Sequence, residues 1–161
     1  MFNLIEAYLN GIAWDVVQDS DRLATLPSTE QGALQNISTQ SLKWKLKELP
    51  RIVGRAALPA TAHAALAFIL DNAKPLRDAL VHPSPFPTPA KYGGHDKLGL
   101  FYSIDATLAS RTLGHGVVVL DAIHGLVAPT MSAVARDLPW LEELRAADLR
   151  LRTLRQDLGA P

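Results

Sequence analysis

The sequence predicts an all-α protein, a bundle of four to five helices. The first observation is that apolar residues recur three and four positions apart along most of the 161-residue chain, the period of an amphipathic helix. The second is composition, since 48% hydrophobic and 20% charged residues are typical of a globular chain and not of a disordered one. The length fits one domain, residues 1–161.

The first 50 residues predict two helices. The first is expected to reach about residue 23, since its apolar positions follow the helical spacing: Phe2, Ile5, Leu9, Ile12 and Val16. Ser28 or Thr29 can cap the second helix. That helix continues as far as Pro50, which closes or kinks it, through Leu34, Ile37, Leu42 and Leu46.

A third helix is expected from a cap at Thr61 to His82. Pro75 lies inside this pattern and either kinks the helix or begins a new turn. Pro83 disfavours helical geometry at the residue before it, so the helix should end at His82. The following segment, "PSPFPTPAKYGGHDKLG", is expected to be a loop, either a stiff wall of a site or a polyproline ligand for a partner domain.

Two further helices are expected in the C-terminal half. One runs from about Lys97 to Val127; its interior "GHGVVVLDAI" would also suit a strand, although no partner strand is evident. The last follows Pro139 and carries a heptad-like seam of Leu144, Ala147, Leu151, Leu154 and Leu158. This seam either packs in the core or makes residues 136–161 a dimer or partner contact.

Charge is balanced overall, with 16 basic and 16 acidic residues, but it is unevenly distributed. Residues 41–91 hold eight bases and three acids, so the middle third is basic. A neutral whole disfavours a non-specific nucleic-acid coat but permits one local phosphate site. The absence of cysteine, of a visible signal peptide and of an apolar run long enough to span a membrane predicts a cytoplasmic protein.

Arg77, Asp78 and His82 form the most informative short motif, "LRDALVH". Asp78 and His82 are four apart, so on a helix the carboxylate can orient the imidazole and favour its charged form. An arginine suits a phosphate, and a histidine suits general acid–base catalysis. Together they suit cleavage of RNA by its own 2′-hydroxyl, which needs no metal. The alternative is a helix C-terminal cap, since cations favour that end.

The motif resembles the signature of the HEPN superfamily (higher eukaryotes and prokaryotes nucleotide-binding domains). Arg77 matches the family's arginine, Asp78 its polar second position and His82 its histidine, with four residues between Arg77 and His82. The resemblance implies a HEPN-like helical bundle with the Pro/Gly-rich loop after the motif. Active members are metal-independent endoribonucleases that work as dimers with facing motifs, many of them toxins or antiviral effectors. Other members bind nucleotides, RNA or proteins without catalysis.

The resemblance implies that His82 acts as general base or acid, that Arg77 stabilises the transition state and that Asp78 orients His82. It implies RNA as substrate, a homodimer, an antitoxin or a fused domain as a further partner, and no metal or cofactor. Substrate-binding residues are expected along a basic stripe and on the loop: Lys43, Lys47, Arg51, Lys91 and His95. Trp44 beside the stripe would either stack a base or turn into the core.

A metal-dependent phosphohydrolase is a third hypothesis. His95–Asp96 resembles the pair of the HD phosphohydrolases, which need further ligands from several helices. Those ligands would be sought among the remaining imidazoles and a carboxylate: His63, His115, Asp121 and His124. A single histidine on an apolar helix is, however, more often a core or surface residue.

Overall fold

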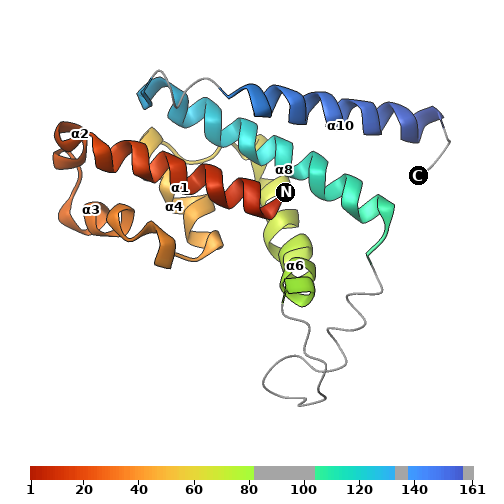
Figure 1. Cartoon of the computed structure of the whole chain (residues 1–161), viewed down its shortest axis with the longest axis horizontal. Coiled ribbons are helices and arrows are strands. Elements are labelled where there is room, and N and C mark those ends of the chain that lie inside the picture. Colours follow the sequence, from red (N-terminus) through yellow and green to blue (C-terminus); the bar gives the residue numbers. More distant parts are fainter. Residues whose placement is uncertain (82–103, 133–137, 158–161) are drawn as a thin grey trace, which may run out of the picture.

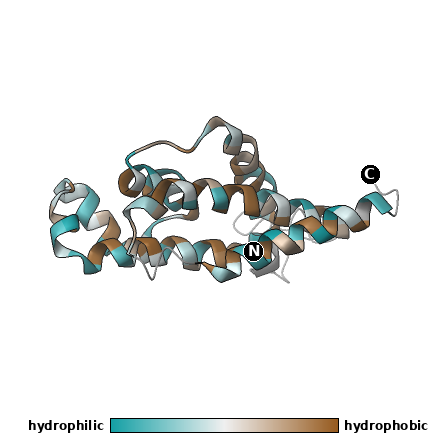
Figure 2. Cartoon of the chain, turned by 90° about the horizontal axis from the view of Figure 1, so that it is seen from above, coloured by the Kyte–Doolittle hydropathy of each residue, from teal (hydrophilic) through white to brown (hydrophobic). Residues whose placement is uncertain are grey.

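The computed structural model describes residues 1–81, 104–132 and 138–157 (Figure 1). These residues are helical and contain no strand, which confirms the all-α prediction at this level. Brown and teal residues share each helix in Figure 2, as expected where one side of a helix packs inward and the other meets solvent.

The first predicted helix is two helices. α1 (Phe2–Gln18) ends at Asp19, whose backbone is extended. The Asp19 side chain accepts a hydrogen bond from the backbone N–H of Arg22 and so caps α2 (Ser20–Ala24). An aspartate that caps the following turn competes with continuation of the helix, and this explains why the prediction ran too far.

The second predicted helix is also wrong as a single element. It divides into α3 (Ser28–Gln35), the 3₁₀ turn η1 (Ile37–Thr39) and α4 (Leu42–Gly54). Ser41 begins α4 by accepting a hydrogen bond from the N–H of Trp44. Pro50 does not close α4 but lies buried inside it, and α4 ends where Arg55 adopts a left-handed conformation with φ of 54°.

The third predicted helix is continuous but irregular. α5 (Ala60–Ala67) follows Pro59 at the capping position, so Thr61 is not the cap. The π-helix η2 (Phe68–Ala73) leads into α6 (Lys74–Val81), and the N–H of Lys74 donates to the carbonyl of Ile69 five residues earlier. Pro75 cannot donate a backbone hydrogen bond, and the wide turn before it absorbs this interruption. The expected end at His82 lies outside the described residues.

α8 (Ala106–Val127) is the central helix and packs against α1, α4, α5 and α10. Asp105 caps its start, and the expected segment 97–103 lies outside the described residues. The valines that suited a strand are helical, because the core surrounds this segment and offers helices to pack on. Its fully buried side chains include Val119, Leu120 and Ile123.

Among the described residues, one helix, α8 with its following turn η3 (Ala128–Thr130), is long and apolar enough to cross a membrane by length and composition. The sequence predicted no apolar run of this length. These two properties do not distinguish a membrane span from the central helix of a bundle, which is the position that α8 takes here. A cytoplasmic location stays a prediction.

α10 (Pro139–Asp157) lies along α8, and its C-terminal half extends past the first residue of α1 (Figure 1). Leu141 is buried in the core and Leu144 packs against it. Leu151 and Leu154 are instead exposed, and Leu158 lies outside the described residues. The seam is therefore a core contact at its beginning and a free surface beyond it.

Candidate functional site

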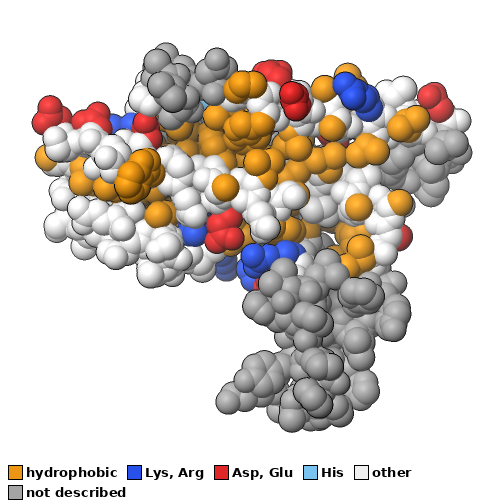
Figure 3. Space-filling view, viewed as in Figure 1, with side chains coloured by type: hydrophobic (Ala, Val, Ile, Leu, Met, Phe, Trp, Pro, Cys, Tyr) orange, Lys and Arg blue, Asp and Glu red, His pale blue; other side chains and the backbone are white. Residues whose placement is uncertain are grey.

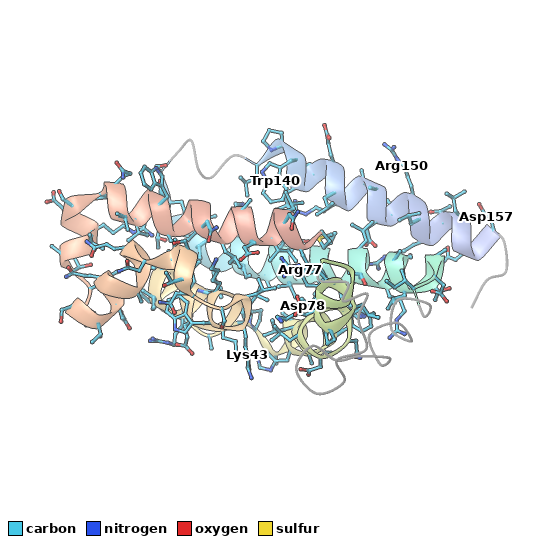
Figure 4. The ribbon with its side chains drawn as sticks, turned by 60° about the horizontal axis from the view of Figure 1, so that its bottom comes forward. Lys43, Arg77, Asp78, Trp140, Arg150 and Asp157 are labelled. Carbon is cyan, nitrogen blue, oxygen red and sulfur yellow. The ribbon has the colours of Figure 1, made fainter. Side chains whose placement is uncertain are left out.

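Arg77 lies on α6 between two carboxylates. Its Nη1 donates to Oδ1 of Asp78 at 3.0 Å, and its Nη2 lies 3.8 Å from Oε2 of Glu6 on α1. Lys74, one turn earlier on α6, donates to the other oxygen of Asp78. Figure 4 shows Arg77 and Asp78 together at this helix. The guanidinium is thus oriented from two elements, while the side chain keeps 30% of its surface exposed.

The same Glu6 also holds a lysine inside the core. Lys45 is 1% exposed, and its Nζ lies 3.2 Å from Oε1 of Glu6. Glu6 therefore joins α4 and α6 to α1 through one carboxylate. The sequence contains a signal for Lys45: it falls among Leu42, Leu46 and Leu49 on the apolar face of α4, where a charge needs a partner.

This charged cluster, defined as Glu6, Lys45, Lys74, Arg77 and Asp78, contains three cations and two anions. Burial raises the pKa of Asp78, but the hydrogen bonds and charges of Lys74 and Arg77 outweigh it, so that pKa lies below its usual value. The carboxylate of Asp78 is then ionised near neutral pH. The cluster keeps one positive charge in excess, which suits an anion such as a phosphate.

Arg77 also lines an apolar cavity of about 560 Å³. The walls come from the start of α1, from α6, from α8 and from Leu144 of α10. The Nε of Arg77 is buried and has no hydrogen-bond acceptor among the described residues. A ligand at this position would therefore meet a cation at the edge of an apolar surface.

The predicted basic stripe lies in a second hollow. Lys43, Lys47 and Arg51 line a groove of about 500 Å³ between α4 and α5, together with His63. Arg51 is already paired, with Glu48 at 2.8 Å and Glu30 at 3.1 Å. Trp44 packs against the core and does not line this groove, so its base-stacking role is not favoured.

A third hollow lies between the basic groove and the Arg77 cavity. It shares Asp71 with the groove, and it shares Leu76 and Leu108 with the cavity. Arg111 adds a cation to its wall, although Asp71 and Asp105 add acids. The three hollows form a chain around η2 and α6, and only some of the charges along it are positive.

Three of the predicted site residues cannot be placed. His82, Lys91 and His95 lie outside the described residues, as does Asp96. The predicted pairing of Asp78 with His82 therefore stays a prediction. The described contacts of Asp78 are with Lys74, four residues before it, and with Arg77.

The other histidines have partners of their own. The Nδ1 of His124 lies 2.9 Å from the Tyr8 hydroxyl, while Asp121 accepts a hydrogen bond from Arg145. His115 stacks on Phe68 with ring centroids 4.3 Å apart. Within residues 1–81, 104–132 and 138–157, no three His, Asp or Glu side chains are grouped to hold a metal ion.

No protein-family model, no curated protein and no solved structure matches the chain. The HEPN resemblance therefore depends on the short motif and its helical setting, and it stays a prediction.

The Glu6–Lys45 pair generates the first prediction. Glu6→Gln should destabilise the protein by up to about 3 kcal/mol, the lower end for breaking a buried pair, because Glu6 is one-third exposed. Lys45→Met removes the charge but keeps the stem, so it should cost much less. Urea unfolding measures both, and the double variant should be more stable than Glu6→Gln alone. Equal losses in the two single variants would contradict the role given to the buried charge.

The second prediction concerns two half-buried histidines, His115 and His124. Burial lowers the pKa of His124 and of His115, and nearby arginines lower both further. Below about pH 6.5 the unfolded chain binds protons that the folded chain does not, so stability falls as the pH falls. The melting temperature should drop between about pH 7.5 and about pH 5.5. His115→Phe keeps a ring on Phe68 and should reduce this drop; an unchanged drop would exclude His115 as a cause.

Proposed function

We propose that the protein is a metal-independent endoribonuclease with a HEPN-like helical fold. It cleaves RNA by attack of the 2′-hydroxyl on the neighbouring phosphorus, which breaks the bond from phosphorus to the 5′-oxygen of the next nucleotide and leaves a 2′,3′-cyclic phosphate and a 5′-hydroxyl. His82 acts as general base or acid, Arg77 stabilises the charge that develops on the phosphoryl oxygens, and Asp78 orients His82. The reaction needs no cofactor from the protein.

The observation that supports this proposal best is the setting of Arg77. Glu6 and Asp78 hold the guanidinium from two helices, yet the side chain remains partly exposed beside a cavity. A cation that is fixed before the substrate arrives needs little reorganisation when charge develops on a phosphate. The excess positive charge of the cluster supports the same role.

The chain of hollows supports RNA as the substrate. Lys43 and Lys47 are exposed cations in the basic groove, and that groove reaches the Arg77 cavity through the hollow at Asp71. A strand bound along this path would meet phosphate-binding cations at one end and Arg77 at the other. Lys91 and His95 are proposed to complete substrate binding. Acidic side chains also line this path, and their repulsion of phosphates would limit the bound RNA to a short segment.

The cellular setting is proposed from the resemblance. A toxin or an antiviral effector would act in the cytoplasm, as a homodimer and with an antitoxin or a fused domain as a further partner. None of these features has a counterpart among the described contacts.

A non-catalytic binding module for nucleotide, RNA or a protein is the second candidate. One observation favours it: both carboxylate oxygens of Asp78 already accept hydrogen bonds, from Lys74 and Arg77. Because Asp78 is already paired in this way, the charged cluster can bind an anion without taking part in catalysis. A metal-dependent phosphohydrolase is the least favoured candidate. Asp121 accepts a hydrogen bond from Arg145 and His124 contacts Tyr8, so these two side chains do not converge on one metal position.

The proposal predicts loss of cleavage in two variants. His82→Ala should slow RNA cleavage by about 10²- to 10⁴-fold, and Arg77→Ala by about 10²- to 10³-fold. Single-turnover cleavage of a labelled RNA measures both. Arg77→Lys keeps the charge near Glu6 but not the planar donor fork, so it should recover activity only in part.

Arg55→Gly is the matched control for removing an arginine. Arg55 has a left-handed backbone that glycine adopts readily, so this variant should fold and cleave like the parent protein. Circular dichroism and thermal melting should show that all four variants keep their helices. Cleavage that persists after both His82→Ala and Arg77→Ala would remove the proposal, and RNA binding without turnover would select the binding module.

A further inference from the structure

We propose that α10 is a self-association surface, on which α10 of a second copy of this chain packs in the antiparallel direction. The inference concerns a helix that the proposed chemistry does not use. It depends on burial, on apolar spacing and on charge within α10 itself.

The outer half of α10 lacks an apolar partner among the described residues. Leu141 and Asp148 face the bundle and are 2% and 6% exposed. After Asp148, Leu151 and Leu154 are 37% and 55% exposed. A helix segment of this length is marginal in water unless its apolar side is covered. The exposed leucines therefore indicate a surface that a partner covers.

The exposed leucines continue a regular seam. Leu144, Ala147, Leu151 and Leu154 follow steps of three, four and three, so they lie along one side of the helix. Ala147 is small and lies near the middle of α10, where two helix backbones could approach closely. Figure 3 shows hydrophobic side chains in a broad band on the viewed face, over α1 and α10. Leu144, the first residue of this seam, also lines the Arg77 cavity.

Charge along α10 favours a second copy in the antiparallel direction. Residues 139–148 contain three acids and one base, whereas residues 149–157 contain three bases and one acid. Two antiparallel copies place each acidic half on a basic half, and two parallel copies place like charges together. The sequence of α10 is therefore complementary to itself only when one copy is reversed.

Glu143 and Arg150 are the charges proposed to make this contact. Arg145 pairs with Asp121 and Glu142, and Arg152 pairs with Asp148. Among the described residues, Glu143 and Arg150 make no ion pair.

Glu143 and Arg150 are seven positions apart and lie on the same flank of the seam. In an antiparallel pair centred on Ala147, Leu151 packs on the partner's Leu144. Glu143 then faces the partner's Arg150. The two-fold symmetry repeats both contacts.

The mass of the protein in solution tests the surface directly. Light scattering or sedimentation should show a dimer for the full chain. Leu151→Glu combined with Leu154→Glu should weaken it by on the order of a hundredfold or more, because each change occurs twice in the interface. Leu149→Glu is the control, since Leu149 is 65% exposed on the opposite flank, and it should leave the dimer intact.

Charge exchange tests the direction. Glu143→Arg alone and Arg150→Glu alone each set like charges together and should weaken the dimer by about three- to tenfold. An equimolar mixture of the two variants, or the double variant, restores opposite charges at both contacts and should restore the dimer. A monomer at every concentration of the parent protein overturns the inference. The inference is also overturned if Leu151→Glu combined with Leu154→Glu leaves the dimer unchanged. It is overturned as well if mixing Glu143→Arg with Arg150→Glu does not restore the dimer. These masses are measured without RNA, so they do not depend on cleavage.

Discussion

The buried ammonium of Lys45 is the constraint on which the arrangement of α1, α4 and α6 depends. A lysine with 1% of its surface exposed requires a carboxylate, and Glu6 supplies it from the neighbouring helix. Glu6 in turn approaches Arg77 with its other oxygen. One side chain on α1 therefore determines where two helices place their cations. The apolar residues around them provide most of the stability, and we infer that the charged cluster specifies how the helices are positioned relative to one another.

This constraint links the core to the proposed chemistry. Because Arg77 takes its orientation from Glu6 and Asp78, its guanidinium is fixed before any substrate binds, as the proposed role at a phosphate requires. The same pairing reduces the free charge of the site, which agrees with the neutral chain and with the proposal of one local phosphate site in place of an extended basic surface. The Arg77 cavity also reaches Leu144, the first residue of the α10 seam. A second copy bound along that seam would lie beside the site without any change to its charges.

Much of the fold could be predicted from the sequence, because apolar spacing reports which side of a helix faces the core. The central helix α8 and the first half of α10 follow that rule, whereas Leu151 and Leu154 of α10 are exposed. The breaks at Asp19 and Ser41 were missed because a capping side chain competes with helix continuation over a few residues, and spacing alone does not measure that competition. The shared groove of Lys43, Lys47 and Arg51 follows from steps of four along one helix. The ion pair between Glu6 and Arg77 could not be predicted in this way, since it depends on how two helices far apart in the sequence pack.

The proposed reaction has a direct chemical test. The measurement is cleavage of a short RNA by protein treated with a chelator, compared with the same RNA carrying a single 2′-deoxynucleotide at the cleaved position. An endoribonuclease of the proposed kind cleaves the all-ribose strand, leaves a 2′,3′-cyclic phosphate and does not cleave at the deoxynucleotide. Cleavage at the deoxynucleotide, or complete loss of cleavage in the chelator, would contradict it.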